Sequence, residues 1–101
     1  MNLATSNILC IDNDIFTSEW IKTTLDSAGL PSTVRNARSA SEGFQLLGEE
    51  KFDLCILEYA LKDMTGPQLC TMVRRMGWSV PDDAFTVMDR EIDRKMAVSA
   101  G

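Results

Sequence analysis

Short apolar runs that stop at an acidic residue constrain the fold of this chain most strongly. Asn7–Ile11 reads NILCI and stops at Asp12, while Leu54–Leu57 reads LCIL and stops at Glu58. A run that is apolar at consecutive positions is typical of a strand covered on both faces, as in a parallel sheet. These runs predict two buried strands, each with a carboxylate at its C-terminal end.

A helical pattern follows the first run. Asp14 can cap a helix that extends to Ala28, and Gly29 suits a left-handed exit from its end. Apolar residues recur in this segment at helical spacing and are expected to share one face of the helix: Phe16, Trp20, Ile21, Leu25 and Ala28.

Two capping boxes mark further helices. Ser39 to Glu42 predicts a helix over about 40–49, and Thr65 to Gln68 predicts another that ends at Gly77. Weaker signals predict a second strand over Thr33–Asn36, a fourth over Ala84–Met88 and a last helix capped by Asp89, with Ile92, Met96 and Ala100 inward. The alternation of strand and helix predicts an α/β fold with a mostly parallel sheet.

Length and composition limit the classes of function. The 101 residues suit a single domain, 1–101, and the net charge of −5 disfavours direct nucleic-acid binding. No apolar run is long enough to span a bilayer, and the N-terminus lacks the basic start of a signal peptide, so we expect a cytoplasmic protein. The absence of histidine removes the usual general base and most zinc sites.

The three cysteines, Cys10, Cys55 and Cys70, form no CxxC motif and lie in apolar or helical patterns. Burial as free thiols in a reducing compartment is therefore expected, rather than a redox or zinc role.

Acidic residues gather at the predicted C-terminal ends of the strands, where the chemistry of parallel sheets is found. Asp12, Asp14 and Glu58 converge if the first and third strands are neighbours. Such a cluster attracts a cation such as Mg²⁺ weakly, with Asp12 and Glu58 as its ligands, or raises the pKa of its members. Asp14 serves equally well as a helix cap, and Asp63 is interpreted as a turn residue between strand and helix.

The segments ILCIDND, FDLCILEYALKDMTG and Thr86 to Gly101 resemble response-regulator receiver domains, over nearly the whole chain from Asn7. The resemblance implies a doubly wound, flavodoxin-like fold with five strands and five helices. The family's fifth strand, the lysine at its end and the fifth helix have no counterpart in this sequence. Whether residues 1–101 are a whole domain or a fragment stays open.

The resemblance also implies the site residues, with several departures. The family's Mg²⁺-binding acidic pair aligns with Asp12 and Asn13, so one acid is an amide. The phospho-acceptor aspartate aligns with Glu58. Lys62 stands where a proline is usual, while Gly66 matches the glycine of that loop. Thr86 is the candidate for the switch residue at the end of the fourth strand.

These departures oppose phosphorylation. The extra methylene of Glu58 moves its carboxylate, and a misplacement of that size can cost on the order of 100-fold in rate. Asn13 removes a negative charge from the metal site. We therefore expect a receiver-like module that is not phosphorylated, is not an enzyme and needs no cofactor. Glu58 either imitates the phosphorylated state, with about half the charge of a phosphoryl group, or has a purely structural role.

A signalling module of this kind needs a protein partner: a histidine kinase, an output domain or another receiver-like chain. An uncovered fourth strand and last helix would also favour a homodimer. Two alternatives remain open at this stage. One is a receiver that is still phosphorylated in a two-component phosphorelay. The other is a haloacid-dehalogenase-type phosphatase, because Asp12-Asn13-Asp14 resembles its DxD motif and Asp82-Asp83 its later acidic pair, with Asp12 as nucleophile and Asp14 as acid/base.

Overall fold

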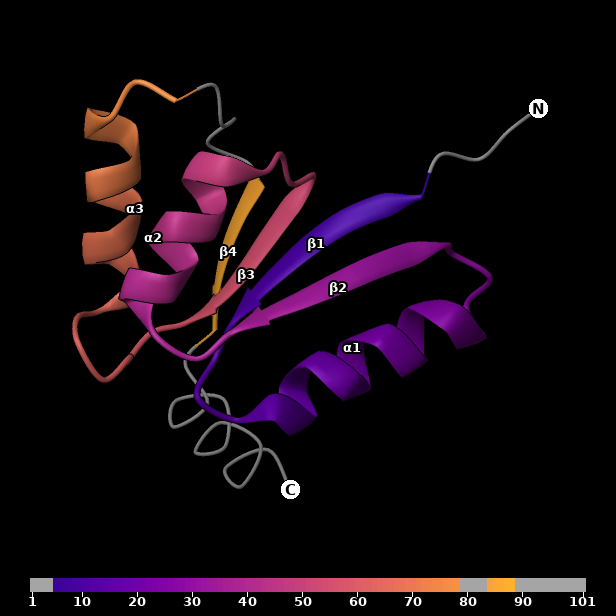
Figure 1. Ribbon diagram of the computed structural model, residues 1–101. Helices are drawn as coiled ribbons and strands as arrows, with labels where there is room; N and C mark the ends of the chain where they lie inside the picture. Colours follow the sequence, from indigo (N-terminus) through magenta and orange to yellow (C-terminus); the bar gives the residue numbers. More distant parts are fainter. Residues whose placement is uncertain (1–4, 79–83, 89–101) are drawn as a thin grey trace, which may run out of the picture.

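A computed structural model describes residues 5–78 and 84–88 (Figure 1). In these residues, strands alternate with helices along the chain: β1 (Ser6–Ile11), α1 (Ile15–Ser27), β2 (Ser32–Ala37), α2 (Ala40–Glu49), β3 (Leu54–Glu58), α3 (Gly66–Arg75) and β4 (Phe85–Met88). The predicted α/β class is confirmed, and the predicted elements in these ranges agree with the observed bounds to within two residues. Asp82, Asp83 and the predicted last helix lie outside the described residues.

The four strands form one parallel sheet with the spatial order β2-β1-β3-β4. β1 therefore lies between β2 and β3, which was the condition for the acidic strand ends to meet. Parallel pairs of this kind need a crossover for each connection, and α1, α2 and α3 supply the crossovers between successive strands (Figure 1).

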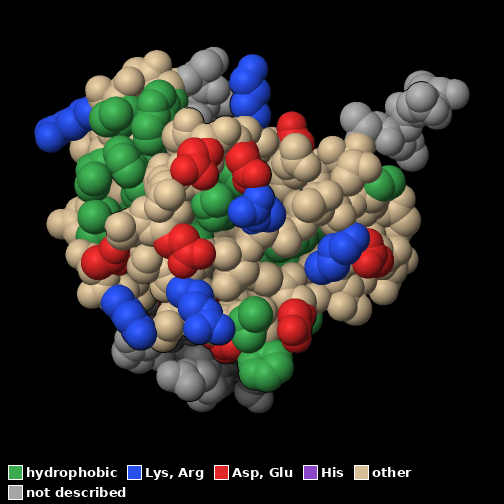
Figure 2. Space-filling view, viewed as in Figure 1, with side chains coloured by type: hydrophobic (Ala, Val, Ile, Leu, Met, Phe, Trp, Pro, Cys, Tyr) green, Lys and Arg blue, Asp and Glu red, His purple; other side chains and the backbone are tan. Residues whose placement is uncertain are grey.

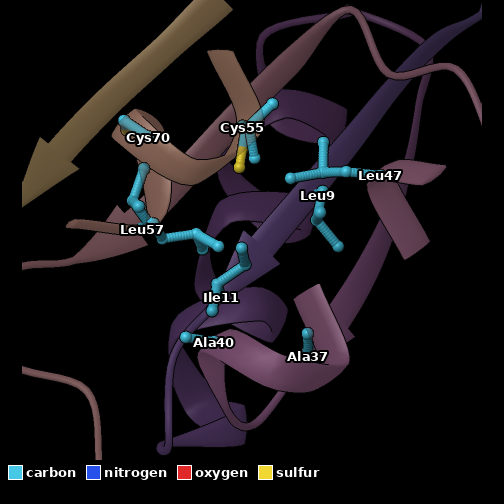
Figure 3. Packing of buried hydrophobic residues seen from close by; sticks show 10 residues of the cluster. Leu9, Ile11, Ala37, Ala40, Leu47, Cys55, Leu57 and Cys70 are labelled. Carbon is cyan, nitrogen blue, oxygen red and sulfur yellow. The ribbon is translucent and has the colours of Figure 1, made fainter. Parts of the chain in front are cut away.

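α2 and α3 cover one face of the sheet and form the main core with it (Figure 3). The centre of this core consists of side chains from β1 and β3 that are at most 1% exposed: Leu9, Ile11, Cys55 and Leu57. α2 approaches closely because Gly43 has no side chain, since a Cβ there would collide with the side chain of Ile11. Around this centre pack Ala37, Ala40, Leu47, Leu69, Cys70 and Val73.

α1 lies alongside β2 and packs on the opposite face of the sheet (Figure 1). Its buried residues are Thr17, Ser18 and Ile21, which lie on one side of the helix. Phe16 and Trp20, which were grouped with Ile21 by their helical spacing, lie outside this buried side, because their side chains are 70% and 67% exposed. The helix thus turns its two aromatic residues outward and rests on small and β-branched side chains.

The α1 side of β3 is less well covered than the core side. Cys55 and Leu57 on the core side are buried, whereas Leu54 and Ile56, which alternate with them, are only half-buried. Of the described helices, α1 lies on this face, and it contacts mainly β2. One half of this sheet face is therefore a half-exposed apolar strip beside α1.

Local capping confirms most of the predicted helix starts. Thr65 and Gln68 form the complete capping box of α3, with bonds of 2.9 and 3.3 Å. Ser39 caps α2 through the N–H of Glu42, but the Glu42 carboxylate accepts from the N–H of Arg38 instead of Ser39. Gly29 and Gly77 both follow a helix with positive φ, at 74° and 70°, which glycine adopts without steric cost.

Both kinds of charge are spread over the surface, and hydrophobic side chains gather over α3, where Met72 and Met76 are 39% and 52% exposed (Figure 2). Of the helices in the described ranges, none has the length and apolar character that crossing a membrane requires.

The three cysteines are free and buried, as predicted. Burial, with smaller effects from Cys70 and Cys10, raises the pKa of the Cys55 thiol to about 12, and burial also raises the pKa of Cys70. Thiols of this kind stay protonated at neutral pH and react slowly.

Candidate functional site

The carboxylates that end β1 and β3 lie next to each other at the C-terminal edge of the sheet. The register pairs Ile11 with Leu57, so the next residues, Asp12 and Glu58, continue two adjacent strands that are spaced about 4.8 Å apart. Asp12 is only 2% exposed and Glu58 is half-buried. The structure thus brings together the two acids on which the predicted site depends.

Asp12, Asn13 and Asp14 form a tight turn from β1 into α1. The Asp12 Oδ1 accepts the N–H of Asp14 at 2.9 Å, and the N–H of Asp12 donates to the carbonyl of Ala37 at 2.9 Å. Asp14 caps α1 by accepting the N–H of Phe16 at 3.0 Å. Asp14 therefore has the capping role that was one of its two predicted roles, and Asn13 is exposed beside it.

Asp12 and Glu58 would hold a divalent cation at this edge if one binds. Mg²⁺ prefers near-octahedral oxygen coordination and usually takes one or two carboxylates, with waters or phosphates completing the shell. Within residues 5–78 and 84–88, no group of three or more His, Cys, Asp or Glu side chains has a metal-holding arrangement. Weak binding of Mg²⁺ by Asp12 and Glu58 stays a prediction.

The register of β4 places Met88, rather than Thr86, beside Glu58. Thr86 pairs with Ile56, two residues before the strand end, and Met88 pairs with Glu58. The pairing of β3 with β4 extends one residue beyond Glu58, because the N–H of Tyr59 donates to the carbonyl of Met88 at 2.7 Å. Thr86 shares the sheet face of Glu58 but lies one pleat away, about 6–7 Å along the strand. A switch role for Thr86 stays a prediction.

The loop after Glu58 is folded tightly back on the strand. The N–H of Gly66 donates to the carbonyl of Tyr59 at 2.7 Å, and the N–H of Leu61 donates to the carbonyl of Met64 at 3.1 Å. A Cβ on Gly66 would lie 2.8 Å from the carbonyl oxygen of Glu58. Only glycine allows this approach, so Gly66 fixes the path of the chain immediately next to the candidate site.

Asp63 lies in the turn between β3 and α3, as predicted, and it also binds the start of another helix. Its Oδ1 accepts the N–H of Ala40 at 3.0 Å, and its Oδ2 accepts the N–H of Ser41 at 2.9 Å. Both bonds lower the pKa of the Asp63 carboxyl below its usual value of 3.8, and the bond from Ser41 has the larger effect. The anion also suits the positive end of the helix dipole. Asp63 therefore joins the loop that follows Glu58 to α2.

Replacement of Asp63 by Asn is expected to destabilise the fold at neutral pH, with an effect that fades in acid. Because the folded-state pKa is lowered, the charged carboxylate contributes stability above pH 3.8, and this contribution is lost as the pH falls through the lower folded value. Urea unfolding of both proteins at neutral pH and at several values below 3.8 checks this. Glu49→Gln, an exposed acid bonded only within α2, is the control. An unchanged difference between Asp63→Asn and wild type across this range would refute the role of the charge.

Comparison with known proteins gives a consistent result. The family model of the response regulator receiver domain matches residues 8–101. An uncharacterized 14.6 kDa protein from Leptolyngbya boryana is 34% identical over 101 residues, which are 98% of this chain and 76% of that protein. The probable transcriptional regulatory protein SilR of Salmonella typhimurium is 32% identical over 74 residues, covering 73% of this chain but only 32% of SilR.

Solved structures agree on the fold. The MaeR response regulator bound to beryllium trifluoride superposes with a TM-score of 0.72 at 22% identity, over 85% of this chain and 68% of that chain. The receiver domain of the PhyR response regulator from Erythrobacter litoralis gives a TM-score of 0.67 at 16% identity, over 97% of this chain and 73% of that chain. At these identities the likeness concerns the fold alone.

Proposed function

The chain belongs to the response regulator receiver domain family, and from this we propose that it is a pseudo-receiver, a signalling module that acts through protein contacts without being phosphorylated. The observation that carries the proposal is the composition of the strand ends. Glu58 closes β3 where the family has its phospho-acceptor, and Asn13 follows the buried Asp12. Membership of this family favours the pseudo-receiver proposal over a phosphatase that uses Asp12 as nucleophile and Asp14 as acid/base.

The geometry around Glu58 supports the loss of phosphorylation. The main chain that follows Glu58 is held by the hydrogen bond from the Tyr59 N–H to the Met88 carbonyl of β4 and by the close approach of Gly66 to the Glu58 carbonyl. The strand end therefore has little freedom to retract and compensate for the extra methylene of the glutamate. Phosphoryl transfer depends on positioning and on neutralising charge, and Asn13 weakens the second of these as well. Any Mg²⁺ bound by Asp12 and Glu58 is proposed to be weakly held.

Incubation with Mg²⁺ and acetyl phosphate tests this proposal. We expect the intact mass of the wild-type chain to stay unchanged, while a phosphorylatable receiver domain treated in parallel gains one phosphoryl group. Glu58→Asp, alone and combined with Asn13→Asp, measures how far the two departures explain the loss. A stable phosphoryl adduct on the wild-type chain would contradict the proposal and support the phosphorelay alternative.

The pseudo-receiver function has two versions, which differ in the role of Glu58. As a fixed imitation of the phosphorylated state it supplies about −1 where a phosphoryl group supplies nearly −2. As a structural residue it only completes the acidic edge. Glu58→Gln removes the charge and keeps the size, so a change in partner affinity with unchanged stability would favour the first version.

Receiver domains act on protein partners such as kinases and output domains, and we place the partner contact on α1. Phe16 and Trp20 lie one turn apart on this helix and are 70% and 67% exposed, which is unusual for aromatic side chains unless they contact another molecule. They follow directly after the acidic turn at Asp12 and Asp14. A basic and apolar partner surface suits this combination and the net charge of −5. The protein is proposed to act in the cytoplasm.

Self-association is proposed to involve β4 and the region that follows it. β4 is the end strand of the described sheet and pairs only with β3 there, with Val87 40% exposed. Free strand edges invite pairing with a second chain. Light scattering at moderate concentration is expected to give the mass of a dimer. A monomer at that concentration would contradict this part of the proposal and leave the pseudo-receiver function untouched.

A further inference from the structure

Two buried hydroxyl groups at the junction of α1 and β2 have no hydrogen-bond partner. Ser18 Oγ on α1 and Ser32 Oγ on β2 belong to side chains that are 7% and 6% exposed. Buried polar atoms are almost always paired, because an unpaired one costs free energy. Ser18 also lines a groove of about 520 Å³ between the two elements. The Ser18 hydroxyl oxygen itself has almost no exposed surface, so it lies beneath the wall of the groove and only other atoms of Ser18 line it.

The outer edge of β2 forms the second wall of this groove. Two hydrogen bonds mark the ends of the ladder between β1 and β2. The Ser6 N–H donates to the Pro31 carbonyl at one end, and the Asp12 N–H donates to the Ala37 carbonyl at the other. In a parallel ladder, alternate residues turn both backbone groups to the same neighbour. The odd-numbered residues of β2 thus face β1, and the even-numbered residues, among them Val34 and Asn36, face outward.

The outward backbone groups of β2 are only partly used. Lys22 Nζ donates to the Ser32 carbonyl at 2.8 Å and so covers the first part of the edge. No described residue hydrogen-bonds the backbone N–H or C=O of Val34 or Asn36. These two residues also line the groove, although the side-chain amide of Asn36 donates to the Cys10 and Asp12 carbonyls. The free edge is therefore two residues long and lies directly against the groove.

The remaining lining residues suit a peptide in extended conformation. Ile15 and Val34 offer apolar contact, and Glu19 offers an exposed carboxylate that forms no ion pair with a described residue. An added strand takes its affinity from main-chain hydrogen bonds and its specificity from alternate side chains. The Glu19 carboxylate and the net charge of −5 favour a basic side chain in the peptide.

We propose that the groove between α1 and β2 binds an extended basic peptide segment of a partner protein, which adds to the outer edge of β2 as a further strand. A basic side chain of the peptide reaches the exposed carboxylate of Glu19. Lys22 limits the ladder to Val34 and Asn36, so the contact is short and weak. This surface is separate from the Phe16 and Trp20 surface and from the β4 edge.

Titration of the nitrogen-15-labelled chain with the blocked peptide Lys-Val-Thr-Val-Lys tests the proposal by NMR. We expect saturable downfield shifts and slower hydrogen exchange at the amides of Val34 and Asn36, because these N–H groups gain acceptors. The peptide Lys-Val-Pro-Val-Lys, which lacks the central N–H, and the peptide Glu-Val-Thr-Val-Glu are each expected to bind about tenfold more weakly, a factor that corresponds to about 1.4 kcal/mol. Equal binding of the proline peptide, saturable shifts centred on β4 or α3, or no saturable shift would overturn the proposal.

Two variants separate peptide binding from effects on folding. Val34→Pro removes the outward N–H and leaves the β1–β2 ladder intact, because proline is tolerated where a strand edge faces solvent. We expect this variant to lose the peptide-induced shift at the Asn36 amide. Glu19→Lys changes an exposed side chain and is expected to reverse the preference between the basic and the acidic peptide. An unchanged preference in Glu19→Lys would overturn the proposed orientation even if Val34→Pro does not fold.

Discussion

Leu9→Ala is expected to lower the free energy of unfolding by about 2–5 kcal/mol, enough to unfold much of a small domain under ordinary conditions. Leu9 is fully buried in β1, one of the two inner strands of the described sheet, and its side chain points into the core beneath α2 and α3 (Figure 3). Truncation removes buried apolar surface and leaves a cavity that neighbouring strands cannot close. Urea denaturation followed by circular dichroism measures the change.

Trp20→Ala is the matched control for this prediction. It removes a larger side chain, but one that is 67% exposed, so the free energy of unfolding should change by no more than about 0.5 kcal/mol. If the two substitutions destabilise the protein equally, the packing of α1 and the position of the core are not as described.

Gly66→Ala is the second prediction with a large effect, about 1–3 kcal/mol of destabilisation. The new Cβ would lie 2.8 Å from the Glu58 carbonyl oxygen, and because this atom is main chain, the strand end or the start of α3 must shift. The amide resonances of Glu58 and Tyr59 should move along with the loss of stability, measured by NMR and urea denaturation on the same samples.

Gly48→Ala is the control for Gly66→Ala, because it also replaces a glycine but creates no contact with the main chain. Its Cβ would lie 3.0 Å from the ring of Trp78, a side chain that can move by a few tenths of an ångström. Alanine is also favoured over glycine within a helix, by at most about 1 kcal/mol, and by less at Gly48 because it lies in the last turn of α2. We therefore expect little net change, and an effect as large as that of Gly66→Ala would show that contact with the Glu58 main chain is not the cause.

The strands and the helix ends could be predicted because their signals are local. Consecutive apolar residues before Asp12 and Glu58 fix two inner strands, and the Thr65–Gln68 capping box fixes the start of α3. The buried face of α1 could not be predicted in the same way. Helical spacing of apolar residues grouped Phe16 and Trp20 with Ile21, but this helix lies on the sheet through Thr17, Ser18 and Ile21. Tertiary position, rather than spacing, decides between these faces.

The candidate site was predicted where it depends on strand ends and missed where it depends on contacts between distant segments. Asp12 and Glu58 follow from the strand pattern once β1 and β3 are neighbours. The position of Met88 beside Glu58 depends on a register that no local signal specifies. The role of Asp63 depends on two amides of α2, and a lone aspartate between strand and helix gives no sign of them.

The two caps of α2 differ in when they can form. Ser39 receives its bond from a residue three positions away, so this cap is available as soon as the helix begins to form. Asp63 lies 23 positions from Ala40 and 22 from Ser41, and closing a segment of that length costs entropy that local contacts do not. The Asp63 cap can therefore form only when the loop after β3 lies beside α2, so the first turn of this helix and the loop that follows Glu58 hold each other in place.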